Sequence, residues 1–206
     1  MLQAIIFDFG GVFMKTTDYQ PRHQWDHRLG LPPGSVERIV HGSESWRAAQ
    51  KGQLSMESYW QDVAQQLHLT ADEVRQLADD FYSGDSLDSA LVQIAKSLRE
   101  RGLRVALLSN DGPHLRHKLD HLGITDLFDP LVISADIGVM KPDARAYQAV
   151  LDLLGCRPDE TLFIDDMPAN IEGAQAVGMN GIQYTTPASL QTALNKWLPA
   201  PPRQQT

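Results

Sequence analysis

The chain has 206 residues, of which 42% are hydrophobic and 21% charged, and its 26 acidic against 18 basic side chains give a formal net charge of −8. This acidic balance argues against nucleic-acid binding, because proteins that bind a phosphate backbone concentrate Lys and Arg, and it favours small ligands as partners. The length allows one sizeable core with a smaller insertion.

Four short apolar runs, each followed by polar residues, predict the buried strands of a parallel sheet. They are residues 2–7, 104–108, 131–133 and 161–164. Four helical patterns, each followed by a glycine, alternate with these runs. They cover residues 89–101, before the second run, and residues 115–122, 144–154 and 169–177, after the second, third and fourth runs. The alternation predicts a Rossmann-like three-layer α/β/α core, in which right-handed crossovers place helices on both faces of the sheet.

Residues 18–85 interrupt this alternation, since their patterns are helical only. The helical patterns cover residues 24–29, 35–41, 45–51, 56–67 and 72–82. Thr70 and Glu73 form a capping box that opens the last of these helices. We interpret residues 18–85 as an α-helical cap domain inserted after the first strand, so that residues 1–17 and 86–198 form the catalytic core. Residues 199–206, with three prolines, are expected to be a flexible tail.

Polar side chains that could take part in catalysis or binding lie where the predicted strands end. They are Asp8, Ser109 with Asn110, Lys141, and Asp165 with Asp166. Taken singly, each could be a helix cap, a turn former or a surface charge, except Asp8, which ends a strand too apolar to be exposed. Ligands bind beyond the carboxyl ends of parallel strands, so these side chains are expected to converge. Three carboxylates and one lysine in one cleft are costly unless a cation and an anion occupy it.

The same segments resemble the four motifs of the haloacid dehalogenase-like (HAD) superfamily. The first motif is matched by residues 5–12 (IIFDFGGV), the second by 107–110 (LLSN), the third by 141–143 (KPD) and the fourth by 163–174 (FIDDMPANIEGA). The helical insertion between the first two motifs implies subfamily IA with a cap of type C1. The pattern DFGGV is similar to a branch that includes bacterial α-glucose-1-phosphate phosphatases.

This resemblance implies a Mg²⁺-dependent phosphatase that hydrolyses a small phosphorylated metabolite, with a sugar phosphate favoured. Asp8 would be the nucleophile and would form an aspartyl-phosphate intermediate, which splits one difficult step into two easier ones. The Mg²⁺ ion would be held by Asp8, the backbone carbonyl of Gly10 and Asp166. Asp165 and Asn170 would order the water around the metal.

The resemblance also implies which groups hold the phosphate. Ser109 and the backbone amide of Asn110 would donate hydrogen bonds to its oxygens. Lys141 would neutralise negative charge on Asp8 and on the transferring phosphoryl group. Together with Asp8, Lys141 is therefore expected to be catalytic.

Gly10 departs from the pattern of most phosphatases in the superfamily. They carry a second aspartate there as general acid and base, and such proton transfer contributes about 10²–10⁴ in rate. Asp111 could take over this role, although we expect it to form a turn. Because related dehalogenases also lack the second aspartate, a 2-haloacid dehalogenase is one alternative, and a non-catalytic phospholigand-binding member is another. Asp165 and Asp166 favour the phosphatase, since those dehalogenases need no metal and carry small polar residues at the two positions.

The remaining signals concern the compartment. Cys156 is the only cysteine, which excludes an intramolecular disulfide and a cysteine-based metal cluster and suits a reducing compartment. Residues 1–13 lack the basic region and cleavage site of a signal peptide. No uncharged run approaches the roughly 18 residues of a membrane helix. We expect a cytoplasmic protein with no membrane partner, either a monomer or a homodimer.

Overall fold

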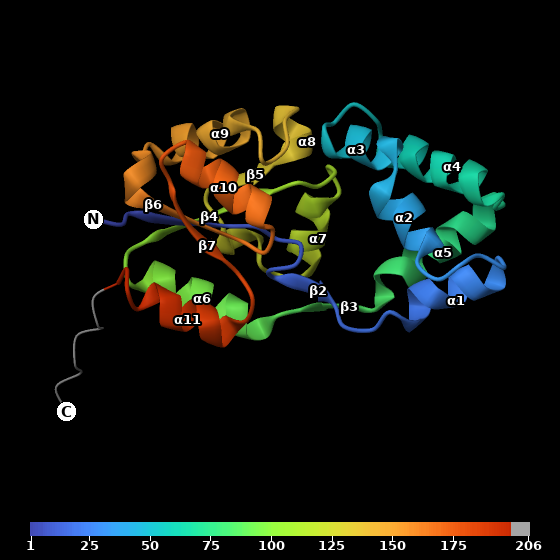
Figure 1. The fold of residues 1–206 in the computed structure, drawn as a ribbon, viewed down its shortest axis with the longest axis horizontal. Coiled ribbons are helices and arrows are strands. Elements are labelled where there is room, and N and C mark those ends of the chain that lie inside the picture. The colour runs from blue at the N-terminus through green and yellow to red at the C-terminus, as the bar shows by residue number, and fades with distance from the viewer. Residues whose placement is uncertain (199–206) are drawn as a thin grey trace.

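The computed structural model describes residues 1–198, so the predicted tail at residues 199–206 lies outside the described residues. A five-stranded parallel sheet has the order β5-β4-β1-β6-β7. Its strands are β1 (Ala4–Phe7), β4 (Arg104–Ser109), β5 (Leu131–Ile133), β6 (Thr161–Asp165) and β7 (Asn180–Gln183). Helices lie on both sides of the sheet (Figure 1), which confirms the predicted α/β fold class.

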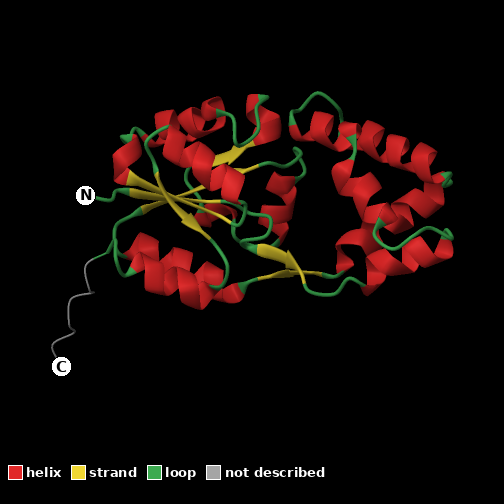
Figure 2. Cartoon of the chain, in the orientation of Figure 1, coloured by secondary structure: helices red, strands yellow, loops and turns green. Residues whose placement is uncertain are grey.

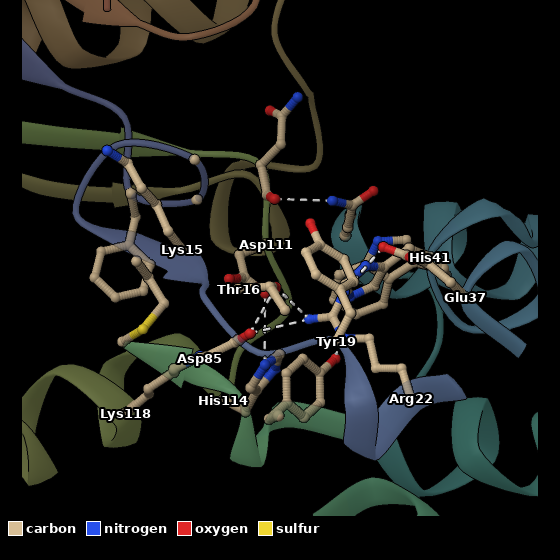
Figure 3. A pocket seen from close by; sticks show the side chains of 18 residues that line it. Lys15, Thr16, Tyr19, Arg22, Glu37, His41, Asp85, Asp111, His114 and Lys118 are labelled. Atoms are coloured by element: carbon tan, nitrogen blue, oxygen red, sulfur yellow. Dashed lines mark hydrogen bonds and ion pairs between the residues drawn. The ribbon is translucent and has the colours of Figure 1, made fainter. Parts of the chain in front are cut away.

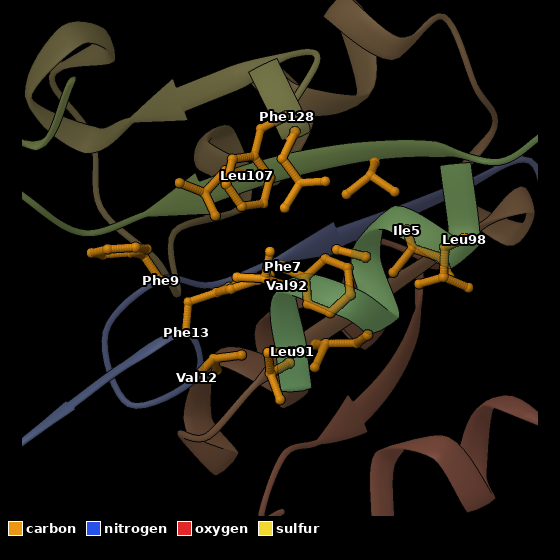
Figure 4. Packing of buried hydrophobic residues seen from close by; sticks show 14 of the residues in the cluster. Ile5, Phe7, Phe9, Val12, Phe13, Leu91, Val92, Leu98, Leu107 and Phe128 are labelled. Carbon is orange, nitrogen blue, oxygen red and sulfur yellow. The ribbon is translucent and has the colours of Figure 1, made fainter. Parts of the chain in front are cut away.

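Alternate side chains of the central strand enter two different cores. Ile5 and Phe7 pack with residues of α6 (Ser89–Glu100), α7 (Leu115–His121) and α11 (Pro187–Leu194), as Figure 4 shows for part of this cluster. On the opposite face, Ala4 and Ile6 pack with residues of α9 (Ala144–Leu154) and α10 (Pro168–Ala176). Burial on both faces explains why the strands read as continuous apolar runs.

The strand β7 and the helix α11, near the C-terminal end of the core, are absent from the sequence prediction. The strand β7 has the sequence Asn-Gly-Ile-Gln and lies at the edge of the sheet, where it pairs only with β6 and needs no apolar run. The helix α11 begins at Pro187, and the hydroxyl of Thr186 caps it by accepting a hydrogen bond from the Ser189 amide at 3.2 Å. A capping residue followed by proline is a helix-start signal that the sequence does contain.

A two-stranded antiparallel ribbon, also absent from the prediction, joins the sheet to the helical insertion (Figure 2). It pairs β2 (Met14–Thr16) with β3 (Asp85–Leu87). Three residues per strand are too few for an alternating pattern to be recognised in the sequence. The insertion therefore leaves the core after β2, a short distance beyond the first strand.

The insertion consists of five helices between the two ribbon strands. They are α1 (Gln20–Arg28), α2 (Ser35–Gly42), α3 (Glu44–Gln50), α4 (Met56–Leu67) and α5 (Ala71–Ser83). The first begins four residues earlier than predicted, because Pro21 is well placed in a first helical turn. The capping box of Thr70 and Glu73 is confirmed. No helix of residues 1–198 is both long enough and apolar enough to cross a bilayer.

Arg22 connects the insertion to the ribbon through a set of buried polar contacts. Its Nε donates to the Phe81 carbonyl at 3.0 Å, and its Nη1 lies 2.9 Å from Glu37 Oε1. Its Nη2 donates to Thr16 Oγ1 at 2.7 Å and to Asp85 Oδ1 at 3.0 Å. The helices of the insertion also pack around an apolar core of their own. This packing holds the helices together, and the guanidinium of Arg22 attaches them to the ribbon.

Candidate active site

The ends of β1 and β6 bring Asp8 and Asp165 into contact with one lysine. The Nζ atom of Lys141 lies 2.8 Å from Asp8 Oδ1 and 2.7 Å from Asp165 Oδ2. All three residues are buried. Because β1 and β6 are neighbouring parallel strands, their carboxyl ends meet at one edge of the sheet, where convergence was expected.

Asp166 adds a third carboxylate to this cluster. Ligand atoms of Asp8, Asp165 and Asp166 lie within 4.8 Å of one another. Burial, together with the charge of Asp165, raises the pKa of Asp8 to about 7 against the opposing effect of Lys141. Burial and Asp165 also raise the pKa of Asp166. One lysine cannot balance three carboxylates, so the cluster fits a divalent cation that prefers oxygen ligands, such as Mg²⁺.

Asp165 is held by more hydrogen bonds than the other two carboxylates. The Nδ2 atom of Asn170 donates to its Oδ1 at 3.1 Å and to its Oδ2 at 3.0 Å. The backbone amide of Met167 donates to Oδ1 at 2.8 Å. In turn, Tyr147 donates to the Asn170 carbonyl at 2.7 Å. These bonds fix the Asp165 side chain beside Lys141.

Gly11 lies directly against the Asp166 carboxylate. A Cβ atom added to Gly11 would lie 2.3 Å from Asp166 Oδ2, and the φ angle of Gly11 is +74°. We expect Gly11→Ala to displace the Asp166 side chain and to weaken Mg²⁺ binding by roughly 10-fold or more, as loss of groups that orient metal ligands does. Titration calorimetry with Mg²⁺ measures this affinity.

Gly102 provides the matched control for this variant. Its φ angle is +83°, but a Cβ atom added there meets no heavy atom within 4 Å. Gly102→Ala therefore imposes similar backbone strain without a clash, and it should leave the Mg²⁺ affinity unchanged. Equal Mg²⁺ affinities in the two alanine variants would show that the position of Asp166 is irrelevant to the cation.

Ser109 and Asn110 stand at the end of β4, beside the cluster. Ser109 is buried, and its hydroxyl has no hydrogen-bond partner among the described residues. The side chain of Asn110 is fully engaged with the Lys141 backbone, since Nδ2 donates to the carbonyl at 2.9 Å and Oδ1 accepts from the amide at 2.8 Å. The Asn110 side chain is therefore occupied, which leaves its backbone amide for the predicted contact with a phosphate.

The cluster adjoins a cavity of about 550 Å³ (Figure 3), which lies among the core, the ribbon and the insertion. Gly10, Gly11 and Asn110 form its wall on the side of the cluster. Its other lining residues are mainly charged or aromatic. They include Lys15, Tyr19, Arg22, Glu37, His41, Trp46, Tyr82, Asp85, Asp111, His114 and Lys118.

Most of these cavity residues carry no signal in the sequence. Lys118 is an example: its Nζ lies 3.8 Å from Asp85 Oδ2 and 5.2 Å from the centre of the Tyr82 ring. Lys118 lies in α7, Asp85 in β3 and Tyr82 in α5, so only the folded chain brings the three residues together. The spacing of His114 and Lys118, one helical turn apart just after the second motif, is the one signal that points to a shared face.

The insertion also contacts the loop that carries Asn110. The side-chain amide of Gln50, at the end of α3, donates to the Asn110 carbonyl at 2.8 Å. Ser134, in the short helix α8 (Ser134–Ile137), donates to the Gln50 carbonyl at 2.6 Å. Gly52 packs so closely that an added Cβ atom would lie 2.3 Å from the Ala135 carbonyl oxygen. The insertion thus touches the core right beside the cluster.

Comparison with known proteins identifies relatives over nearly the whole chain. The family model described as haloacid dehalogenase-like hydrolase matches residues 2–178. A sesquiterpene phosphatase of Aspergillus oryzae is 28% identical over 184 residues, which cover 89% of this chain and 90% of that protein. A phosphatase of Mycobacterium tuberculosis is 40% identical over 96 residues, but these span only 46% of this chain and 43% of that protein.

Solved structures share the fold. A HAD family enzyme from Bacteroides thetaiotaomicron, solved in complex with magnesium and inorganic phosphate, aligns with a TM-score of 0.75 at 20% sequence identity. The alignment covers 90% of this chain and 95% of that one. At this identity the similarity concerns the arrangement of helices and strands.

Proposed function

Because this chain belongs to the haloacid dehalogenase-like hydrolases, we propose that it is a Mg²⁺-dependent phosphatase that attacks a small phosphate ester with the carboxylate of Asp8. One observation carries this proposal. The carboxylates of Asp8, Asp165 and Asp166 gather around Lys141 beside a cavity large enough for a metabolite.

Asp8, Asp166 and the backbone carbonyl of Gly10 would hold the cation, with Asp165 and Asn170 supporting them. A bound Mg²⁺ ion reduces the repulsion between an anionic nucleophile and an anionic phosphate. The raised pKa of Asp8 supports this assignment, since a cation at the cluster would favour the ionised carboxylate that can attack.

The protein groups around Asp8 have complementary tasks in this proposal. Lys141 holds one oxygen of Asp8 at 2.8 Å, which aims the carboxylate and offsets its charge. The hydroxyl of Ser109 and the amide of Asn110 would bind the non-transferred oxygens of the phosphate. Attack by Asp8 on phosphorus would form an aspartyl phosphate, and water would then release inorganic phosphate.

The helical insertion would act as a cap of type C1 in subfamily IA, since it closes the cavity over the sheet edge and its Gln50 contacts the Asn110 loop. The leaving group of the substrate would occupy this cavity. We infer a hydroxylated leaving group, as in a sugar phosphate. Hydroxyls can form hydrogen bonds with Asp111 and Lys118, whereas a hydrocarbon would displace water from these charged groups and offer no hydrogen bond in its place.

A sesquiterpenyl phosphate is the second candidate, because the Aspergillus relative is a sesquiterpene phosphatase. The aromatic rings of Trp46 and Tyr82 on the cavity wall would suit an apolar chain, and they would equally stack on a sugar ring. The charged lining favours the sugar. In the same proposal, the protein belongs to the branch of α-glucose-1-phosphate phosphatases. It would act in the cytoplasm.

A panel of phosphate esters, assayed with Mg²⁺ and with EDTA, tests the proposed function. The panel contains p-nitrophenyl phosphate, α-glucose 1-phosphate, glucose 6-phosphate and farnesyl phosphate. We expect hydrolysis only with Mg²⁺, and faster hydrolysis of a hexose phosphate than of farnesyl phosphate. Chloride release from 2-chloropropionate in EDTA, without phosphate release from any ester, would instead identify a dehalogenase.

A further inference from the structure

Gly10 leaves Asp8 without a proton donor from its own loop. A Cβ atom added to Gly10 meets no heavy atom within 4 Å, so this part of the cavity is open. Departure of an alcohol from phosphorus needs a proton, and attack by water releases one. In the proposed reaction another group on the cavity wall has to supply and accept this proton.

Three carboxyl groups line the cavity, and two of them are already paired. Glu37 and Asp85 each contact the guanidinium of Arg22, at 2.9 Å and 3.0 Å. Asp111 is the third. It follows Asn110, the residue whose side chain is bonded to the Lys141 backbone. Asp111 therefore lies on the wall of the same cavity that Gly10 and Gly11, the residues after Asp8 and Phe9, also line.

The two oxygens of Asp111 have different surroundings. Oδ1 accepts a hydrogen bond from the amide of the next residue, Gly112, at 2.7 Å and lies 3.5 Å from His114 Nε2. The turn itself begins one residue later than expected, where the Leu115 amide donates to the Gly112 carbonyl. Oδ2 has no partner among the described residues, and the side chain is 19% exposed. The Asp111 amide donates to Ser134 Oγ at 3.0 Å, which fixes the loop. One oxygen thus anchors the side chain and the other is available to a ligand (Figure 3).

The surroundings of Asp111 also affect its protonation. Burial raises the pKa of the carboxyl, while His114, the Gly112 amide and Lys118 oppose this effect. Tyr82 from α5 lines the same part of the cavity. A raised pKa increases the protonated fraction near neutral pH, which suits a group that must donate a proton before it accepts one.

We propose that Asp111 is the catalytic acid and base of this enzyme and acts in place of the aspartate that is absent at Gly10. The proposal rests on the phosphatase function above. In the first step Asp8 attacks phosphorus, the bond from phosphorus to the leaving oxygen breaks, and Oδ2 of Asp111 gives its proton to that oxygen. In the second step Asp111 takes a proton from water, whose oxygen attacks phosphorus. The bond to Asp8 then breaks, and Asp111 is protonated again.

The variant Asp111→Asn tests this role while keeping the side chain anchored, because the asparagine oxygen can accept the same hydrogen bond from the Gly112 amide. The first step determines kcat/KM, and only a poor leaving group needs the acid there. We therefore expect kcat/KM to fall at least about 100-fold for glucose 6-phosphate but less than about 10-fold for p-nitrophenyl phosphate. With p-nitrophenyl phosphate, kcat should also fall and a burst of nitrophenol should precede the steady state.

Two further measurements distinguish proton transfer by Asp111 from a general loss of structure and from the absence of phosphatase activity. Asp136→Asn removes a carboxylate of α8 that does not line the cavity, and it should leave kcat/KM unchanged for both substrates. Equal losses of kcat/KM for the two substrates, or no loss, would overturn the role of Asp111. If the unaltered protein hydrolyses none of the four esters of the panel, the phosphatase function itself is wrong.

Discussion

Asp8→Asn is expected to abolish phosphate ester hydrolysis, with kcat reduced by roughly 10⁴-fold or more, as when a covalent nucleophile is removed from an enzyme. The amide that replaces the carboxylate is a poor nucleophile toward phosphorus and a weaker ligand for Mg²⁺. The measurement is the rate of p-nitrophenyl phosphate hydrolysis with saturating Mg²⁺.

The same variant should fold at least as stably as the unaltered protein when Mg²⁺ is absent. Lys141 is shared by two buried carboxylates, so removal of the Asp8 charge leaves it matched with Asp165 alone. Burial also disfavours the charged form of Asp8, and the neutral amide of asparagine avoids this cost. Thermal unfolding in EDTA measures this. Undiminished activity of a folded Asp8→Asn protein would refute the role of Asp8.

Lys141→Met is expected to lower both activity and stability. Methionine has a similar length but no charge, so two buried carboxylates lose the lysine that contacts both of them. Removing one partner of a buried ion pair costs about 3–5 kcal/mol of unfolding free energy. Removing one group that stabilises transition-state charge lowers kcat by about 10²–10³-fold.

Urea unfolding and steady-state kinetics measure the two effects of Lys141→Met. Added Mg²⁺ should restore part of the lost stability, because the cation would compensate the same carboxylates. Lys96→Met, at an exposed position of α6, is the matched control and should change neither quantity. If Lys141→Met unfolds at the same urea concentration as this control and retains full activity, the ion pairs have no role in the site.

The sequence allows prediction of the part of the site that follows from strand order. Asp8 and Asp165 end apolar runs that can only be buried strands, and parallel strands present their carboxyl ends at one edge. Their approach is therefore a consequence of topology. The shared contact with Lys141 is not, because this lysine lies in a loop whose path depends on the whole fold.

The cavity could not be predicted for a related reason. Arg22 and Asp85 are far apart in the sequence, and their ion pair requires the ribbon of β2 and β3, whose strands are too short to be recognised. Which side chains of the insertion face the core depends on this connection. The residue type of Asp111 predicts a turn, which the structure places one residue later, whereas the free oxygen of its carboxylate is visible only in three dimensions.

The central claim is that Asp8 becomes phosphorylated in a reaction that needs Mg²⁺. Its most direct test is mass spectrometry of protein quenched with acid during turnover of a phosphate ester. We predict one added phosphoryl group on the peptide that contains Asp8, present with Mg²⁺ and absent with EDTA. A phosphoryl group on a different residue, or full turnover in EDTA, would contradict the account.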